Sequence, residues 1–156
     1  MCLFYYITFF YFTENLLQAP YAYAAVAPHD GEMVSLVMPY ANSICMGIFL
    51  AETAKRFPDD YILIVADKAA WHTAKSLTIP ENIELFPLPS YSPELNPTEH
   101  IWDETREKGF KNEIFNSLSA VEDRLCTTLH DLETDMERVR SITGWDWIVC
   151  INLNAN

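Results

Sequence analysis

The sequence predicts an α/β domain with a mixed sheet flanked by helices, and three features support this fold class. Two short apolar segments, residues 21–27 and 32–38, surround an Asp-Gly pair and are typical of a β-hairpin. The continuous apolar run at residues 61–66 has strand length and suits a central strand buried on both faces. Segments with apolar residues at every third or fourth position precede and follow this run, which predicts covering helices.

The helix before the central strand is expected from Asn42 or Ser43 to about Phe57. Both candidate first residues are good N-caps, and Pro58 ends the segment. Its apolar residues Ile44, Ile48 and Ala51 fall on one face.

The second half of the chain predicts a short helix over residues 69–77, a short strand over 83–86 and then two clearer helices. Asn96 is a good N-cap, Pro97 fits the first helical position and Glu99 the third, with Gly109 as the stop.

A longer helix is expected from about Ser119, because Ser119 and Glu122 have capping-box spacing. The aromatic residues 145–148 are expected to pack back onto the core. One apolar stripe runs along the helix through Leu118, Val121, Leu125, Leu129, Leu132, Met136 and Val139.

The bulk composition suits one globular domain of 156 residues, because 50% of the residues are hydrophobic. The formal net charge of −12 is unfavourable for a DNA-binding surface, which needs Lys and Arg for phosphate contacts. A centre that binds metal ions through carboxylates is compatible with an acidic chain.

The N-terminal segment, residues 2–12, is almost wholly apolar and aromatic. It is too short to span a bilayer and has no basic flank, so we expect no membrane association. Two interpretations remain open: a buried strand, or sequence that does not belong to the domain. We therefore separate residues 1–20, of uncertain origin, from a domain over residues 21–150.

Asp67 and Glu99 are the candidate catalytic residues. Asp67 follows the buried strand, and the carboxyl end of a strand is where α/β sheets place functional groups. The alternative for Asp67 is a surface residue that caps a turn. For Glu99 the alternative is a helix-capping role, since a third-position Glu accepts backbone N–H groups.

Residues 88–102 read Leu-Pro-Ser-Tyr-Ser-Pro-Glu-Leu-Asn-Pro-Thr-Glu-His-Ile-Trp, and residues 65–72 read Val-Ala-Asp-Lys-Ala-Ala-Trp-His. Both stretches resemble motifs of the insertion-sequence 630 and Tc1/mariner group of DDE transposases, around the last and the second catalytic acid. Residues 25–31 resemble the hairpin of that family, and the resemblance extends from residue 21 to about residue 147.

The resemblance implies an RNase H-like fold in which three carboxylates hold two Mg²⁺ or Mn²⁺ ions for DNA cleavage and strand transfer. On this basis Asp67 is the second carboxylate and Glu99 the third, and both are metal ligands. Two hard cations held about 4 Å apart by carboxylate oxygens suit phosphoryl transfer. The implied partner is DNA at transposon ends, with a homo-oligomer also compatible, and the implied location is the cytoplasm, at the nucleoid if the source is bacterial.

The chain departs from the family pattern in two places. The family's first Asp lies on a strand before the hairpin, whereas residues 1–20 contain no Asp and only one acid, Glu14. Lys68 stands where the family usually has Asn, next to Asp67, and a cation there opposes metal binding. His72 matches the family's His, and its role is open between a metal-shell contact and a structural one.

We therefore expect an RNase H-like sheet whose first strand is missing or replaced, in an N-terminally truncated and catalytically impaired transposase domain. Whether the chain is an enzyme stays open, because the first catalytic Asp is absent. One alternative is a non-catalytic remnant that keeps the fold and weak nucleic-acid or protein binding. Another is a small hydrolase with Asp67 and Glu99 as an acid–base pair, which leaves the 88–102 motif unexplained.

Overall fold

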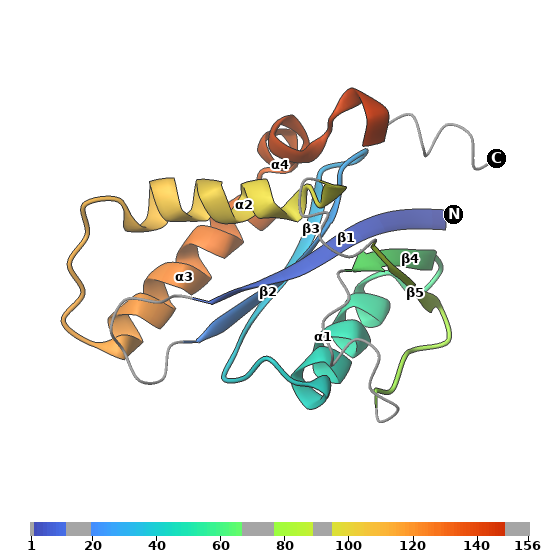
Figure 1. Cartoon of the computed structure of the whole chain (residues 1–156), viewed down its shortest axis with the longest axis horizontal. Helices are drawn as coiled ribbons and strands as arrows, with labels where there is room; N and C mark the ends of the chain where they lie inside the picture. The colour runs from blue at the N-terminus through green and yellow to red at the C-terminus, as the bar shows by residue number, and fades with distance from the viewer. Residues whose placement is uncertain (1, 12–19, 67–76, 89–94, 149–156) are drawn as a thin grey trace.

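The computed structural model describes residues 2–11, 20–66, 77–88 and 95–148, and it confirms the α/β fold class. Five strands form one mixed sheet in the order β3-β2-β1-β4-β5 (Figure 1). The strands are β1 (Cys2–Tyr11), β2 (Tyr21–Ala27), β3 (Glu32–Met38), β4 (Tyr61–Ala66) and β5 (Ile83–Pro87). The helices are α1 (Ser43–Arg56), α2 (Thr98–Thr105), the π-helix η2 (Arg106–Phe110), α3 (Leu118–Glu133) and α4 (Met136–Thr143).

The apolar N-terminal segment forms the middle strand of the sheet. Tyr6 of β1 lies opposite Val26 of β2 in an antiparallel pair and opposite Val65 of β4 in a parallel pair. Of the two sequence expectations, a missing or a replaced first strand, the structure supports the second, because residues 2–11 occupy that position. A strand paired on both edges and covered on both faces must be apolar, which explains the composition of this segment.

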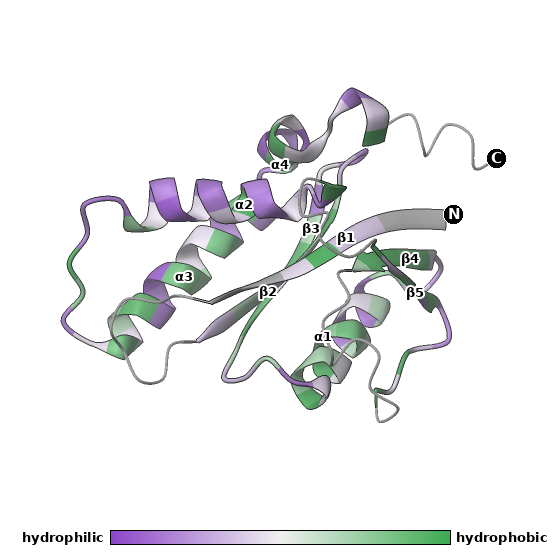
Figure 2. Ribbon diagram, viewed as in Figure 1, coloured by the Kyte–Doolittle hydropathy of each residue, from purple (hydrophilic) through white to green (hydrophobic). Residues whose placement is uncertain are grey.

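Two hydrophobic clusters lie on the two faces of the sheet, because successive side chains of a strand point to opposite sides. Tyr5 and Ile7 of β1 face α1, whereas Tyr6 belongs to the cluster under α2, α3 and α4. The helices therefore form separate layers around the sheet, with α1 on one side and α2, α3 and α4 on the other (Figure 1). The visible side of α2 is mainly hydrophilic, while β4 is hydrophobic (Figure 2).

The predicted hairpin is confirmed over β2 and β3, from Tyr21 opposite Met38 to Ala27 opposite Glu32. Gly31 in its turn has a φ of 79°, a left-handed conformation that glycine adopts without steric cost. A Cβ atom at Gly31 would also overlap the carbonyl oxygen of Met136 at the start of α4. The Asp-Gly turn thus serves both the reversal of the chain and the close approach of α4.

The helices mostly match their predicted positions, with three corrections. The Asn42 cap of α1 is confirmed, since its side chain accepts the N–H of Cys45, but Ile44 and Ile48 are 74% and 52% exposed. The other apolar face of α1 is the one that packs. Gly109 does not end a helix but lies inside η2, where a Cβ would crowd Thr128 of α3.

The third correction concerns the long apolar stripe, which belongs to two helices and not to one. Ser117, and not Ser119, caps α3 by accepting the N–H of Ala120. The stripe is interrupted at Asp135, whose side chain accepts the N–H of Arg138 and starts α4. The predicted packing of residues 145–148 is confirmed for Ile148, which belongs to the cluster under α2, α3 and α4, and for Trp145, which packs against that cluster, whereas Trp147 is 44% exposed.

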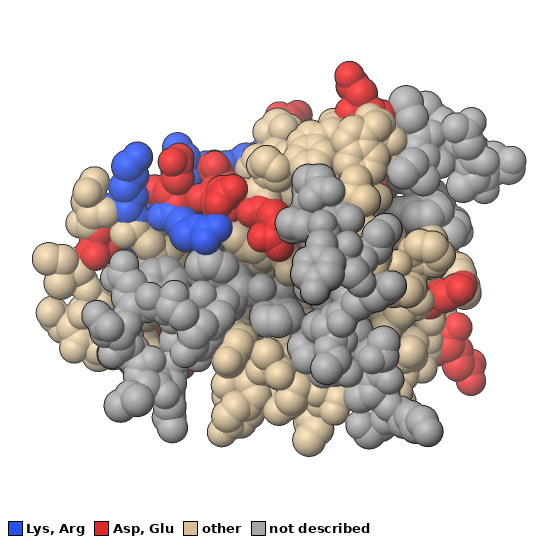
Figure 3. Space-filling view, viewed as in Figure 1, with Lys and Arg blue, Asp and Glu red and all other residues tan. Residues whose placement is uncertain are grey.

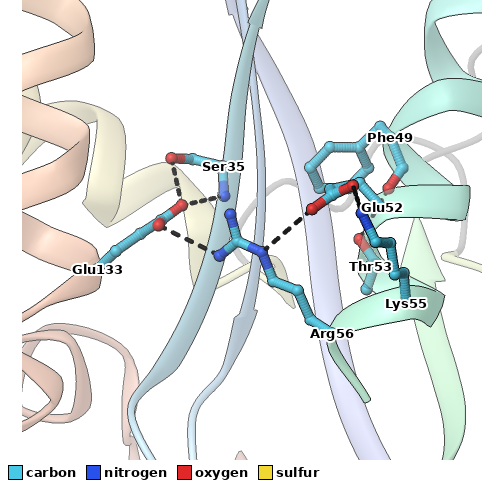
Figure 4. A network of polar contacts seen from close by, with 7 residues as sticks. All are labelled: Ser35, Phe49, Glu52, Thr53, Lys55, Arg56 and Glu133. Atoms are coloured by element: carbon cyan, nitrogen blue, oxygen red, sulfur yellow. Dashed lines mark hydrogen bonds and ion pairs between the residues drawn. The ribbon is translucent and has the colours of Figure 1, made fainter. Parts of the chain in front are cut away.

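A network of polar contacts joins both helical layers across β3, an edge strand of the sheet (Figure 4). Glu133, the last residue of α3, accepts hydrogen bonds from the backbone N–H and the hydroxyl of Ser35 in β3. Its other oxygen lies 3.2 Å from Nη1 of Arg56 at the end of α1. The carboxylate therefore satisfies an edge N–H group and links α3 to α1 around the strand.

Among the described residues, no helix combines the length and the hydropathy that crossing a bilayer requires.

Candidate functional site

The predicted site residue Glu99 lies in the first turn of α2, half-buried against β1. Its Oε1 accepts a hydrogen bond of 3.3 Å from the hydroxyl of Thr8 in β1. Thr8 is 4% exposed and lies on the same face of the strand as Tyr6, under α2. The structure thus brings Glu99 to the middle strand of the sheet, where it contacts the hydroxyl of Thr8.

Two side chains of the Asn-Pro-Thr-Glu motif fix the start of α2 onto β1. Asn96 donates from Nδ2 to the carbonyl of Ile7 at 3.2 Å, and its Oδ1 accepts the N–H of Thr98 at 3.2 Å. The hydroxyl of Thr98 donates to the carbonyl of Tyr6 at 2.9 Å. Asn96 and Thr98 are 3% and 0% exposed, so water does not compete for these bonds. The position of Glu99 is therefore set by its neighbours in the motif.

The helix start differs from the prediction by one residue. Pro97 is at the N-cap position and Thr98 is the first helical residue. Asn96 still satisfies a helix N–H group, as the cap prediction required. Its further bond to β1 could not be predicted, because the partner lies 89 positions away in the sequence.

The carboxyl end of β4 lies beside the same part of β1. Ala66, the last residue of β4, is opposite Ile7, the residue before Thr8. The carbonyl of Ala66 accepts the N–H of Leu88 at 2.6 Å. The predicted site residue Asp67 follows Ala66 in the sequence and lies outside the described residues. The expected short helix at residues 69–77 falls outside them over residues 69–76, and so do Lys68 and His72.

The residues present on β1 do not fit a complete two-metal centre of the kind implied by the family resemblance. Such a centre needs several carboxylate oxygens, since Mg²⁺ prefers hard oxygen ligands. Strand β1 contains no acidic residue, and its Thr8 hydroxyl donates a hydrogen bond to Glu99. Over residues 2–11, 20–66, 77–88 and 95–148, no three His, Cys, Asp or Glu side chains lie together as a metal site.

A separate cavity of about 380 Å³ lies at the start of β4, the other end of that strand from Ala66. Tyr5 lies nearby, and its hydroxyl donates to Glu32 at 3.0 Å. Burial, followed by the charge of Glu32, raises the pKa of Tyr5 above its ordinary value. The cavity contains no predicted site residue, and its lining consists of His29, Asp30, Glu32, Phe57, Asp60, Met136 and Arg140.

Basic and acidic side chains alternate on the face that carries α2 (Figure 3). Arg106 pairs with Asp103 at 2.8 Å, and Arg138 of α4 pairs with Glu104. These ion pairs favour a solvated face over a phosphate-contact surface, because each neutralises a guanidinium that a phosphate would otherwise use.

Comparisons with known proteins agree with this architecture. The family model described as "DDE superfamily endonuclease" matches residues 18–122. A protein of Sinorhizobium fredii (strain NBRC 101917 / NGR234), named as the uncharacterized protein y4pE/y4sA, is 33% identical over 128 residues, which are 81% of this chain and 95% of that protein.

Two similar solved structures are catalytic domains of the Mos1 mariner transposase. The first has a TM-score of 0.57 and 12% identity, and the match covers 90% of this chain and 82% of that one. The second, solved with Raltegravir and Mg, has a TM-score of 0.56 and 13% identity, over 91% and 84% of the two chains. At these identities the likeness shows the fold, which is the RNase H-like fold of these transposase catalytic domains.

Proposed function

The chain belongs to the DDE superfamily endonucleases, and from this premise we propose that it is a transposase-type domain whose DNA cleavage and strand transfer are impaired. The observation that carries the proposal is the contact of Glu99 with Thr8, a hydroxyl on the strand that would have to supply the first carboxylate. If the impairment is complete, the chain is a non-catalytic domain that retains only the fold and weak nucleic-acid or protein binding.

Asp67 and Glu99 are the two acidic residues assigned to the site. Glu99 is positioned by the bonds of Asn96 and Thr98 to β1. Asp67 is joined directly to Ala66, whose partner in β1 is Ile7. The chain connectivity and the strand register thus support a site in which the two acids approach the same part of β1.

Divalent cations such as Mg²⁺ or Mn²⁺, when bound in a DDE-type site, polarise the phosphate and activate the attacking oxygen. This chain contributes two of the three carboxylates that such a site implies. Because Thr8 is neutral and Lys68 adds a positive charge next to Asp67, the site's attraction for cations is weaker than that of three acids. The proposed impairment follows from this reduced negative charge. The proposed substrate is DNA at transposon ends.

A nicking assay tests the proposal. Supercoiled plasmid DNA is incubated with Mn²⁺ and the full chain, and conversion to the open circular form is followed on a gel. We expect the rate to equal that of Glu99→Gln and of the no-protein control. Glu107→Gln, an exposed change of the same charge on η2, serves as the matched control. Nicking by the unchanged chain and by Glu107→Gln, but not by Glu99→Gln, would contradict the impairment.

A further inference from the structure

The Thr8–Glu99 contact has a consequence beyond the loss of activity, although it rests on the proposed function for the identity of the site. We infer that the neutral hydroxyl of Thr8 keeps this junction from binding divalent cations, and that Thr8→Asp converts it into a cation site. The inference rests on the buried hydroxyl of Thr8 on the middle strand, which lies 3.3 Å from the Glu99 carboxylate at the start of α2.

The position of Glu99 is set by hydrogen bonds between the start of α2 and β1. Both the amide of Asn96 and the hydroxyl of Thr98 bond to β1 carbonyl groups. Glu99 also has its own backbone N–H bonded to the carbonyl of Asn96 at 3.2 Å. A new ligand on β1 would therefore meet a carboxylate already at its position, and little ordering entropy would oppose binding.

The hydroxyl of Thr8 and a carboxylate at the same position have opposite effects on Glu99. The hydroxyl of Thr8 donates a hydrogen bond to the carboxylate, so this part-buried contact is favourable. A second carboxylate cannot donate when ionised, and at this separation the two negative charges repel each other. That repulsion is relieved when an oxygen-seeking cation binds between them.

The side-chain direction of Thr8 supports a ligand at this position. Its neighbours Tyr5 and Ile7 point into the α1 layer, whereas Thr8 points to α2. Asp has nearly the size of Thr, so Thr8→Asp adds charge without adding bulk to a residue that is 4% exposed. The substitution thus changes the electrostatics of the junction more than its packing.

Thermal unfolding with and without Mn²⁺, together with calorimetric Mn²⁺ titration, tests the inference on the full chain. The melting temperature of the unchanged chain should be the same in EDTA and in Mn²⁺. Thr8→Asp should unfold at a lower temperature in EDTA and gain about 5–10 °C at saturating Mn²⁺, the shift expected for a ligand well above its Kd. Thr8→Asn, of the same shape without the charge, should show no gain.

The Mn²⁺ response of Thr8→Asp requires the Glu99 carboxylate as a ligand, so the additional substitution Glu99→Gln should abolish the response. A response that persists in the double variant would overturn the inference, and so would a folded Thr8→Asp chain that does not respond. If Thr8→Asp does not fold in either condition, the Mn²⁺ response of the unchanged chain becomes the deciding measurement. A saturable Mn²⁺ response of the unchanged chain contradicts the role of Thr8, and its absence, together with the lower stability expected for Thr8→Val, supports it.

The two proposals fail in different ways. Nicking by the unchanged chain would contradict the proposed impairment. Mn²⁺ binding by the unchanged chain without nicking would overturn only the role given to Thr8.

Discussion

At the scale of single residues, buried polar side chains connect elements that lie far apart in the sequence. Asn96 and Thr98 bond to the carbonyl groups of Ile7 and Tyr6, and Thr8 bonds to Glu99. Each bond joins α2 to β1 in a region with little water, where an unsatisfied polar group is costly. The helix start is thus fixed by specific polar contacts in addition to hydrophobic packing.

Removing the hydroxyl of Thr98 tests this fixation. We expect Thr98→Val to lower the free energy of unfolding by about 1–2 kcal/mol, because a buried carbonyl loses its donor. Urea unfolding measures the change. The matched control is Thr127→Val, since Thr127 is exposed and bonds only within its own helix, and it should change stability by less than about 0.5 kcal/mol. Equal effects of the two substitutions would contradict the role of Thr98.

Buried tyrosines give the protein a stability limit in alkali. Burial raises the pKa of Tyr23 from 10.0 to about 12, and burial also raises the pKa of Tyr6. The unfolded chain releases its phenol protons at a lower pH than the folded chain does. The stabilisation that Tyr23 contributes is therefore complete below pH 10 and is lost as the pH rises towards the folded-state pKa of about 12. We expect urea midpoints to fall above pH 10, and Tyr23→Phe to reduce the slope. An unchanged slope in Tyr23→Phe would show that Tyr23 does not titrate in this way.

At the scale of elements, the Glu133 carboxylate links α3, β3 and α1 (Figure 4). Its two partners differ in environment. The N–H of Ser35 lies on the edge strand under α3, whereas the Arg56 side chain is 36% exposed. The bond to the strand should therefore contribute more than the ion pair, because solvent screens exposed charges.

Three substitutions separate these contributions. Glu133→Ala should cost about 1–3 kcal/mol, because the Ser35 N–H and hydroxyl lose their acceptor. Glu133→Gln keeps a carbonyl oxygen as acceptor, and Arg56→Ala removes the partly exposed ion pairs with Glu133 and Glu52, so each should cost less than about 1 kcal/mol. Chemical unfolding of the three variants gives the order of their free energies of unfolding. A larger loss in Arg56→Ala than in Glu133→Ala would contradict this division.

The sequence predicts the strands well, because their signals are local. The hairpin needs an Asp-Gly turn between apolar runs, and β4 needs one uninterrupted apolar run. The sequence does not reveal the break between α3 and α4, because a stripe of period three or four continues through both helices and Asp135 resembles part of a polar face. Gly109 was misjudged for a related reason, since its close neighbour Thr128 belongs to another helix.

The site was predictable only in part. Glu99 stands in a motif that is recognisable from the sequence alone. The sequence does not identify Thr8 as a site residue, because its contact with Glu99 spans 91 positions and its segment resembles any buried strand. The one sequence signal for Thr8 is that its hydroxyl interrupts an apolar run, since a buried polar residue requires a partner.

At the scale of the whole molecule, the net charge of the chain disfavours the proposed binding to DNA. The net charge is −12, and only 10 residues are Lys or Arg. Among the described residues, basic side chains with an acidic partner are Lys55, Arg56, Arg106, Arg124 and Arg138. Few cations remain to replace the counter-ions of the phosphate backbone, so binding by this chain should be weak.

Fluorescence anisotropy with a labelled duplex measures that binding. We expect no saturation at micromolar protein and physiological ionic strength, and only a shallow dependence on salt. As a matched pair, Lys111→Gln should leave the signal unchanged and Glu107→Lys should raise it slightly, since both positions are exposed. Tight binding with a steep salt dependence would contradict this expectation.

The central claim is that Glu99 meets a hydroxyl, and not a carboxylate, on the middle strand of a DDE-type sheet. Electron paramagnetic resonance tests it most directly, because free aqueous Mn²⁺ gives a six-line signal that weakens when the ion binds to protein. We predict that the unchanged chain leaves this signal at full amplitude at micromolar Mn²⁺. Loss of the signal that corresponds to two ions per chain, restored by Glu99→Gln, would contradict the claim.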